Sequence, residues 1–390
     1  MGRRWKARIA ALAVLLLAAC ELDDPVGTDS PLSDTERHAP AGSAAGMQVF
    51  RFETFGNERF WTDSLLLHEA IQNVDPITAL SVGLKVDSER LPPGFLASAD
   101  LDDPATTVEL LRRDAILGVR AKVDEGLIVR LGITCAFCHS VVDNSAGEGI
   151  GRRLDGWPNR DLQVGTIVAL SSVVQEDAAL LAVLTSWLPG FYDPYFNHDG
   201  INHPVLIPPA YGLQDVPLET YTGEGPISYW NAYVAVTQMH GQGDFSQPLL
   251  GISIDNNPDL VTQKLPLLLA YQLSLLAPPP PEGFFDADAA EAGQAVFAEV
   301  CASCHVPPTF TDAPTLHDAD ETDIDPLYAT RGTTGQYRAT PLRALWQHAP
   351  YFHDGSEATL EDVVDHYEAA LGFSLSTEDR NNLIEYLKSL

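Results

Sequence analysis

The feature that most constrains this chain is a five-residue pattern, Cys-x-x-Cys-His, that occurs twice. The first copy reads CAFCH over residues 135–139, and the second reads CASCH over residues 301–305. Four of the five cysteines belong to these copies, and the fifth is Cys20. The sequence therefore commits nearly all of its cysteine to two local sites.

A cysteine pair with this spacing can form a disulfide, act as a redox dithiol, supply half of a zinc site or attach a haem. The histidine directly after the second cysteine favours haem, because each thiol can add across a vinyl group while the histidine ligates the iron. No spare cysteines exist to complete a zinc tetrad. We therefore predict two covalently bound haems c. The predicted cofactor-binding residues, with the histidines as proximal iron ligands, are Cys135, Cys138, His139, Cys301, Cys304 and His305.

The N-terminus has the pattern of an export signal. Four basic residues precede an apolar run from Ile9 to Ala19 that is too short for a permanent membrane span. The stretch LAAC then resembles the lipobox of bacterial lipoproteins, in which the cysteine is lipidated. We expect residues 1–19 to be a lipoprotein signal peptide and Cys20 to anchor a periplasmic protein to a membrane surface, with the outer membrane as the expected one. An ordinary signal peptide with a chance cysteine is the alternative.

The composition is strongly acidic, with a formal net charge of −31. Removal of residues 1–19 makes the chain more negative still, because that segment holds four basic and no acidic residues. This charge argues against nucleic acid as a partner. It suits a small soluble electron donor such as a cytochrome c or a cupredoxin, although solubility alone is the other explanation.

Composition also divides the chain. Residues 20–46 are rich in Asp, Ser, Pro, Gly and Ala without an apolar period, which predicts a flexible tether. A run of four prolines marks residues 278–285 as a linker. We therefore expect an N-terminal haem domain over residues 47–277 and a C-terminal cytochrome c domain over residues 286–390.

Helical patterns dominate the N-terminal domain. Apolar spacing over residues 106–132 predicts a helix that leads into the first motif, and residues 161–188 predict one or two more. Residues 259–277 predict a helix interrupted by Pro266. Residues 189–226 are dominated by turn residues and aromatics, which predicts a long functional loop region.

The C-terminal segment predicts a small helical unit around its motif. Asp288 is placed to cap the helix that leads into the motif, and Thr359 and Ser376 are placed to cap two more. A carbonyl from Pro307 or Pro308 is positioned to accept the second N–H of the motif histidine.

Two helices of this unit carry a recognisable packing pattern. Gly293 and Phe297 share one face of the first helix, and Tyr386 and Leu387 lie on the last. This resembles class I cytochrome c, whose first and last helices cross at a glycine and an aromatic. We therefore predict a mainly α fold of two cytochrome c-like haem domains, the first enlarged by long loops and extra helices.

Residues 339–360 read ATPLRALWQHAPYFHDGSEATL, followed by EDVVDHY. This stretch resembles the C-terminal domain of bacterial di-haem cytochrome c peroxidases and of the related MauG enzymes, whose pattern runs T-P-x-L-R-N, A-P-Y-x-H-D-G and T-L-x-x-V-V. The N-terminal domain resembles them less well, through GITCAFCHS and the domain order alone.

The resemblance implies a sixth ligand for the C-terminal haem. In that family it lies fourteen positions beyond the histidine of the H-D-G segment, and it is methionine in classical peroxidases and tyrosine in MauG. Counting from His353 gives Tyr367, which shifts the resemblance toward MauG. A tyrosinate stabilises ferric and higher oxidation states, whereas a thioether favours ferrous iron. His366 is the rival ligand, and simple packing of the tyrosine is the alternative.

The family also implies groups between the haems. Backbone carbonyls of the A-P-Y segment, here His348 and Pro350, would help to bind an inter-haem calcium, although Ala344 stands where the family has asparagine. Trp157 would relay electrons between the haems. Ordinary burial of a large aromatic is the alternative.

For the first haem, Met239 is the thioether candidate as sixth ligand, although a methionine is more often in the core. An open or displaceable site would instead bind hydrogen peroxide. Cleavage of the peroxide O–O bond then needs a group that moves a proton. The candidate catalytic residues are His198, His203, Glu224, His240 and His353.

The leading hypothesis is a periplasmic di-haem c-type oxidoreductase that reduces hydrogen peroxide or uses it to oxidise a partner. The alternatives are an electron-transfer cytochrome with two six-coordinate haems, and an oxygenase similar to the rubber-cleaving di-haem enzymes. An apolar cavity over the first haem would favour the oxygenase.

Overall fold

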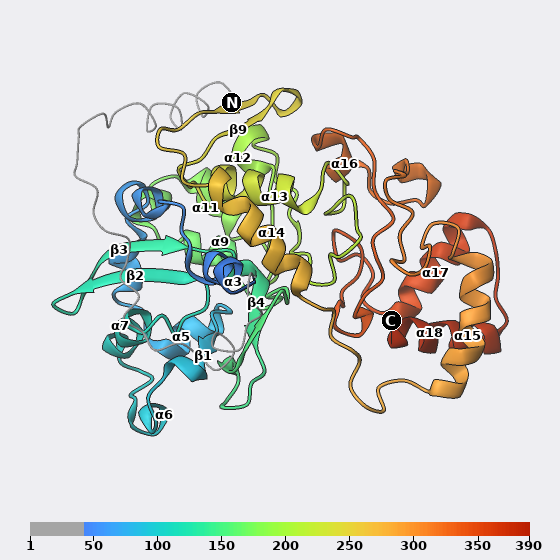
Figure 1. The fold of residues 1–390 in the computed structure, drawn as a ribbon, viewed down its shortest axis with the longest axis horizontal. Coiled ribbons are helices and arrows are strands. Elements are labelled where there is room, and N and C mark those ends of the chain that lie inside the picture. Colours follow the sequence, from blue (N-terminus) through green and yellow to red (C-terminus); the bar gives the residue numbers. More distant parts are fainter. Residues whose placement is uncertain (1–42) are drawn as a thin grey trace.

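The computed structural model describes residues 43–390 as a larger N-terminal region and a smaller C-terminal one (Figure 1). The predicted signal peptide, the anchor at Cys20 and the tether up to residue 42 lie outside the described residues. Order was expected near Met47, and the first described helix, α3, covers Ser43–Phe52. No helix within the described part of the chain is both long and apolar enough to cross a bilayer.

The larger region begins and ends with two helices that pack against each other. Helix α3 lies beside α14 (Leu265–Ser274), although more than two hundred residues separate them (Figure 1). A Cβ atom on Gly46 would come within 2.1 Å of the Leu267 carbonyl oxygen, so only glycine permits this approach. Pro266 lies in the first turn of α14, where its missing N–H is not needed, and the predicted interruption is therefore wrong.

The smaller region repeats this crossing. Helix α15 (Ala287–Val300) packs on α18 (Thr377–Ser389), and a Cβ atom on Gly293 would come within 2.0 Å of the Asn382 carbonyl oxygen. The rings of Phe297 and Tyr386 lie 5.1 Å apart. The cytochrome c-like crossing predicted from the sequence is confirmed. The core of this region consists of Phe297, Leu345, Leu360, Val364, Leu383, Ile384 and Leu387.

Side-chain caps set the helix starts in this region. Thr359 caps α17 (Leu360–Leu371) with a capping box, and Ser376 caps α18, both as predicted. The cap of α15 is Asp286, whose carboxylate accepts from the Ala289 N–H at 3.0 Å. Asp288 was expected there, but it lies in the first turn, where its charge still suits the positive end of the helix dipole.

The predicted helix over residues 106–132 is wrong beyond its first third. Helix α7 ends at Arg112, and an antiparallel hairpin of β2 (Val119–Asp124) and β3 (Leu127–Ile133) follows. Glu125 and Gly126 join the strands with positive φ angles of 47° and 83°, the conformation of a type I′ turn. Apolar residues alternate along β2, and this two-residue period outweighs the helical one. A strand, and not a helix, therefore delivers the first motif.

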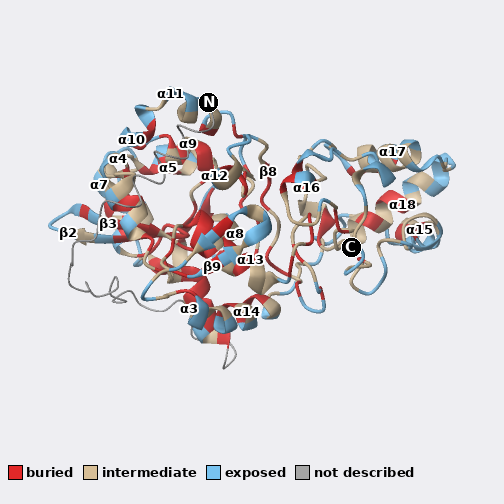
Figure 2. Ribbon diagram, turned by 90° about the horizontal axis from the view of Figure 1, so that it is seen from above, coloured by how far each residue is buried: buried red, intermediate tan, exposed pale blue. Residues whose placement is uncertain are grey.

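Residues 161–188 form three short helices, α9 to α11, where one or two were predicted, and residues 189–226 are mostly irregular, as expected. Buried residues fill the interior of the larger region around α8 and α13 (Figure 2).

The fold is mainly α, as predicted. The remaining helices are η1 (Arg59–Ser64), α4 (Leu67–Ile71), α5 (Pro76–Ser81), η2 (Ser88–Arg90), α6 (Phe95–Ser98), α7 (Pro104–Arg112), α8 (Ala136–His139), α9 (Val164–Val168), α10 (Ser172–Gln175), α11 (Ala178–Leu184), α12 (Phe196–Asp199), α13 (Ile227–Tyr233), η3 (Val234–Gln238), η4 (Pro248–Leu250), η5 (Thr262–Lys264), η6 (Ala319–Glu321), α16 (Leu327–Arg331) and η7 (Leu345–Gln347). The remaining strand pairs are β1 (Val86–Asp87) with β5 (Ile150–Gly151), β4 (Ser140–Val142) with β6 (Arg153–Asp155), β7 (Phe191–Tyr192) with β8 (Val205–Leu206), and β9 (Phe245–Gln247) with β10 (Ile252–Ile254).

Candidate haem sites

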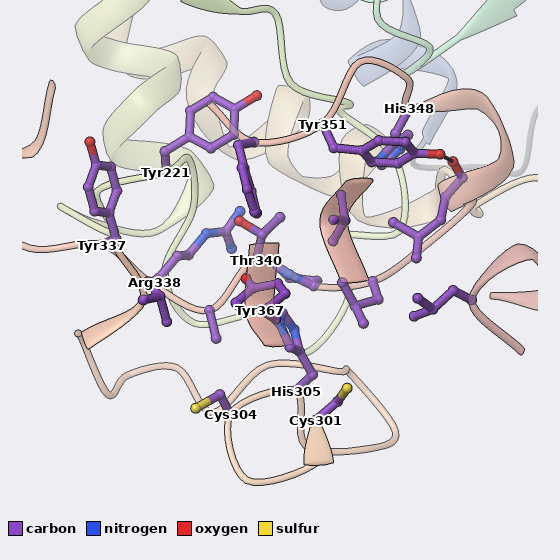
Figure 3. A pocket seen from close by; sticks show the side chains of 18 of the residues that line it. Tyr221, Cys301, Cys304, His305, Tyr337, Arg338, Thr340, His348, Tyr351 and Tyr367 are labelled. Carbon is purple, nitrogen blue, oxygen red and sulfur yellow. Dashed lines mark hydrogen bonds between the residues drawn. The ribbon is translucent and has the colours of Figure 1, made fainter. Parts of the chain in front are cut away.

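The second motif opens onto a cavity. Helix α15 ends at Val300, and the chain turns so that the His305 N–H donates to the Cys301 carbonyl at 3.0 Å. Cys301, Cys304 and His305 line a cavity of about 360 Å³, a volume typical of cofactor pockets (Figure 3). Its wall is largely apolar. The aliphatic and aromatic lining residues from the smaller region include Phe297, Val300, Leu342, Leu360, Leu383 and Leu387.

His305 is held in the form that ligates a metal. Its Nδ1 lies 3.1 Å from the Phe310 carbonyl oxygen, which leaves Nε2 for iron. The predicted partners, Pro307 and Pro308, do not supply this carbonyl, because the chain turns back only at Phe310, where φ is 54°. Burial lowers the histidine pKa, so the ring is neutral, and burial raises the pKa of Cys301 to about 11.

Tyr367 and His366 have different surroundings. Tyr367 lines the cavity, and burial together with the two motif thiols raises the pKa of its phenol (Figure 3). His366 does not line it: its Nε2 lies 2.7 Å from the Thr322 carbonyl oxygen, and its Nδ1 lies 3.4 Å from the Glu357 carboxylate. No methionine of residues 43–390 lines this cavity. The second site therefore offers a phenol and no thioether.

The first motif follows β3, and its last four residues form α8. The Asn57 amide donates to the Ile133 carbonyl at 2.8 Å and accepts the Ile133 N–H at 3.2 Å. The Thr134 hydroxyl donates to the Arg51 carbonyl at 3.0 Å, and Arg51 forms a buried ion pair with Asp155. The local turn matches the second motif, because the His139 N–H again donates to the carbonyl of the first motif cysteine, at 3.2 Å.

The first motif has the protonation states of an attachment site. Burial raises the pKa of Cys135 and Cys138 to about 12 and lowers the pKa of His139 to about 4. Cys135 and Cys138 are half-buried, and each packs against one of the two apolar clusters of the larger region. The His139 Nδ1 is buried without a hydrogen bond of good geometry among the described residues, and the Pro208 carbonyl faces the ring and slightly raises the pKa. Neutral thiols and a neutral imidazole fit haem attachment.

Trp157 stands between the first motif and the second cavity. The N–H of the preceding residue, Gly156, donates to the His139 carbonyl at 2.8 Å. The Trp157 ring centroid lies 5.8 Å from Trp346 and 6.4 Å from Tyr211, which itself lines the cavity. Trp157 therefore connects the backbone of the first motif with an aromatic residue of the cavity wall.

The suggested calcium stays a prediction, and the structure shows the surroundings of its expected residues. His348 and Pro350 line the cavity, and the His348 Nε2 lies 3.0 Å from the Tyr211 hydroxyl. Burial and the neighbouring Arg160 guanidinium lower the pKa of His348 to about 3. The Arg160 guanidinium is thus close enough to the His348 ring to disfavour its protonated form.

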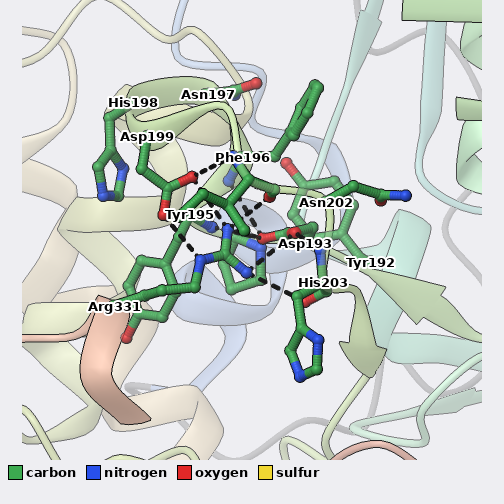
Figure 4. Close-up of polar contacts among 12 residues, drawn as sticks. Tyr192, Asp193, Tyr195, Phe196, Asn197, His198, Asp199, Asn202, His203 and Arg331 are labelled. Atoms are coloured by element: carbon green, nitrogen blue, oxygen red, sulfur yellow. Dashed lines mark hydrogen bonds and ion pairs between the residues drawn. The ribbon is translucent and has the colours of Figure 1, made fainter. Parts of the chain in front are cut away.

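The loop region holds a dense polar network (Figure 4). The Arg331 guanidinium pairs with Asp193 at 2.8 Å and with Asp199 at 2.7 Å. It also donates to the His203 carbonyl at 3.2 Å, and the His203 N–H donates to the Asp193 carboxylate at 2.7 Å. His198 lies at the edge of this network, with its Nδ1 3.4 Å from the Tyr233 hydroxyl.

Glu224 lies next to the polar network. Its carboxylate accepts from the Tyr195 hydroxyl at 2.9 Å, the Tyr229 hydroxyl at 3.1 Å and the Thr333 N–H at 2.6 Å. Burial raises the pKa of Glu224, and these hydrogen bonds offset part of the rise. Glu224 is thus a part-buried acid coupled to two phenols.

His353 links this part of the loop region to the second cavity. It is buried, it lines the cavity, its Nε2 lies 3.3 Å from the Tyr337 hydroxyl, and its ring centroid lies 6.1 Å from that of His203. Burial lowers the His353 pKa to about 4. His198, His203, Glu224 and His353 are therefore joined through a continuous band of aromatic rings that includes Tyr195 and Tyr328.

His240 and Met239 lie elsewhere. His240 stacks on Phe60 with ring centroids 3.6 Å apart, and burial lowers its pKa to about 4. Met239 is buried in the same apolar cluster as Ala136 of the first motif, and its carbonyl accepts from the Trp61 indole at 3.0 Å.

Sequence reasoning missed the cavity wall contributed by the larger region. Arg160, Tyr211, Glu219 and Tyr221 all line the second cavity, although they precede the linker. The sequence held no signal for them, because their place at the cavity depends on how the larger region folds.

Comparisons with known proteins bear on the smaller region. A cytochrome c family model matches residues 290–390. No match came from the curated proteins. Two solved structures are similar: a chain of hydrazine synthase from Kuenenia stuttgartiensis, with 19% identity over 53% of this chain and 78% of that chain and a TM-score of 0.36, and a MauG-like protein associated with microbial copper homeostasis, with 18% identity over 49% and 74% and a TM-score of 0.35.

The family match, the motif and the cavity together define the smaller region as a cytochrome c domain. Such a domain carries covalently bound haem c, here through Cys301 and Cys304 with His305 toward the iron. The chain therefore has a haem-based redox function.

Proposed function

We propose that this protein is a periplasmic di-haem c-type oxidoreductase of the cytochrome c peroxidase and MauG type, which reduces hydrogen peroxide or uses it to oxidise a partner. The observation that carries the proposal is the composition of the second cavity, which presents Tyr367 and no thioether. An anionic oxygen donor favours ferric and higher oxidation states of iron, which a site that stores oxidising equivalents requires.

A second haem at the first motif is part of the proposal. Cys135, Cys138 and His139 repeat the local turn of the second motif and have the neutral states that attachment and ligation need. Bound haem supplies the redox chemistry, and the protein fixes its position, limits water and moves protons. Trp157 lies between the two sites and suits a role in passing electrons.

Glu224 is the favoured proton-transfer residue. Its pKa is raised by burial, and the hydroxyls of Tyr195 and Tyr229 donate to its two carboxylate oxygens. A carboxyl group in this setting can accept a proton at one oxygen while a phenol keeps its hydrogen bond to the other oxygen. His198 and His203 lie in the adjoining network and complete the set of candidates.

The proposed setting follows from the ends and the charge of the chain. A lipid on Cys20 would hold the protein at the periplasmic face of a membrane, and the strongly negative charge of the remaining chain would attract a small basic electron donor. That association should weaken as ionic strength rises.

Electron paramagnetic resonance and absorption spectra of the ferric and half-reduced protein, before and after hydrogen peroxide, test the proposal. We expect a high-spin signal that disappears within the turnover time. Two low-spin haems that are inert to both peroxide and cyanide would overturn the proposal and leave an electron carrier.

Glu224→Gln sharpens this test. The peroxide reaction should slow by about 100-fold or more, the usual contribution of a positioned acid or base. The exposed Glu148→Gln is the matched control and should react at the wild-type rate.

A further inference from the structure

One short segment of the larger region joins the two motif sites. The Gly156 N–H donates to the His139 carbonyl at 2.8 Å, and the Asn159 N–H donates to the Cys138 carbonyl at 2.9 Å. Residues 156–160 are thus fixed at two points to the backbone of the first motif. Arg160 extends from this segment into the wall of the second cavity.

The Arg160 side chain lacks a counter-ion. Its Nε and Nη1 atoms are buried and have no hydrogen-bond partner among residues 43–390, and no ion pair within that range includes it. The Tyr221 hydroxyl is the one side-chain group close enough to favour its charged form by hydrogen bonding. A buried guanidinium without an anion is costly, because one neutral phenol does not replace the water that the charge has lost.

Arg338 and Arg343 line the same cavity, and Arg338 is an example of a guanidinium with a full set of partners. Arg338 pairs with the Glu219 carboxylate at 3.1 Å and donates to the carbonyls of Leu218 and Thr220. Glu219 is thereby paired through its Oε2 atom, and no ion pair of residues 43–390 joins it to Arg160. An anionic group on the occupant of the cavity can supply the carboxylate that Arg160 lacks.

We propose that Arg160 binds a propionate of the haem attached through Cys301 and Cys304, across the boundary between the two regions. Haem carries two propionates, and a guanidinium can hold a carboxylate with two parallel hydrogen bonds. The proposal rests on haem c in the cytochrome c domain and does not depend on reaction with peroxide. Arg160 acts as a positioning residue that ties the second haem to the backbone of the first motif.

A cation beside the propionate favours the ferrous over the ferric state, because the reduced haem carries one positive charge fewer. Arg160→Gln should therefore lower the midpoint potential of the second haem and leave that of the first unchanged. Arg152→Gln is the matched control, because Arg152 lies nearby in the sequence and is exposed, and its ion pair with Asp143 spans 2.8 Å.

A spectroelectrochemical titration of the holo-protein measures both potentials, and a variant with Cys135→Ser and Cys138→Ser assigns the second haem. A lower second potential in Arg160→Gln alone is the expected result. Equal potentials in wild type, Arg160→Gln and Arg152→Gln would overturn the proposal, as would an equal shift at both haems.

A second measurement covers the case in which Arg160→Gln does not accumulate. Arg160→Lys keeps the charge but replaces the planar fork with a single ammonium group. The propionate bending bands in its resonance Raman spectrum should therefore shift from the wild-type positions. Unchanged bands would show that Arg160 does not contact a propionate. Neither measurement depends on the reaction with peroxide. A negative result would therefore overturn the role of Arg160 without affecting the proposed function.

Discussion

The two copies of the same five-residue motif lie in very different surroundings. The second follows a helix in a small region with one core, and it faces a cavity. The first follows a strand and lies between two large cores, with Ala136 in one cluster and Phe137 in the other. The local turn is nevertheless the same in both. The motif therefore determines its own backbone, and the rest of the chain determines what surrounds the haem.

The two regions also share their outermost helix pair. In each, a glycine lets the first and last helices touch, Gly46 against Leu267 and Gly293 against Asn382. Between the helices of the first pair, the hairpin, loops and short helices are inserted, whereas the second pair encloses little more than its motif and the cavity wall. Only the smaller region matches the cytochrome c family model.

Removal of the attachment cysteines should have the largest effect on either motif site. Cys135→Ser with Cys138→Ser, and Cys301→Ser with Cys304→Ser, should each lose one of two haems, because the thioether bonds cannot form. The haem-to-protein ratio, measured from pyridine haemochrome spectra, checks this. A ratio that stays the same in the first pair would mean that the first motif binds no haem.

Alanine at the two glycines should be the next largest effect. Gly293→Ala and Gly46→Ala each force a helix pair apart, and we expect a loss of about 2–3 kcal/mol in the free energy of unfolding. Chemical denaturation measures it. Gln294→Ala, at an exposed neighbour, is the control and should stay within about 0.5 kcal/mol of wild type. If Gly46→Ala leaves the free energy of unfolding unchanged, then only the crossing of α15 with α18 is closely packed.

Acid should destabilise both regions through buried histidines. Burial lowers the pKa of His240 and of His353 to about 4, below the ordinary 6.5. Between those values the unfolded chain binds a proton that the folded chain excludes, so stability falls as the pH falls. Each histidine should cost roughly 1.5 kcal/mol between pH 6.5 and 5.

Unfolding free energies at several pH values measure this loss. His353→Asn should flatten the dependence, and so should His240→Asn in the other region. An unchanged slope in either variant would mean that the corresponding histidine takes up its proton in the folded state.

The smallest change in stability should accompany Tyr367→Phe, since it removes one hydroxyl, yet it should alter the absorption and paramagnetic resonance spectra of the second haem alone. His366→Ala should leave those spectra as they are, because both nitrogens of that ring face other groups. The reverse outcome would make His366 the ligand.

Local signals account for the parts of the fold that the sequence predicts well. Caps at Thr359 and Ser376 and the pairing of Gly293 with the last helix are short-range or periodic patterns, and the structure agrees with them. The hairpin over Val119–Ile133 was missed because its apolar residues also fit a helical spacing over part of their length. Its Glu125–Gly126 turn was the signal that could have corrected this.

The candidate sites divide in the same way. The two motifs follow from spacing in the sequence, and Tyr367 follows from the resemblance of residues 339–367 to the peroxidase and MauG family. The roles of Phe310, Arg160 and Tyr211 do not, because each depends on where a distant segment or a loop lies after folding. Non-local contacts leave no period for a sequence pattern to reveal.

The shared wall of the second cavity has a consequence for assembly. The chain emerges from synthesis N-terminus first, so Arg160, Tyr211 and Tyr221 precede the segment whose cavity they line. A C-terminal fragment cut at the prolines would keep its helices but lose one side of its cofactor pocket to water. The larger region thus acts as a template on which the cytochrome c domain is completed.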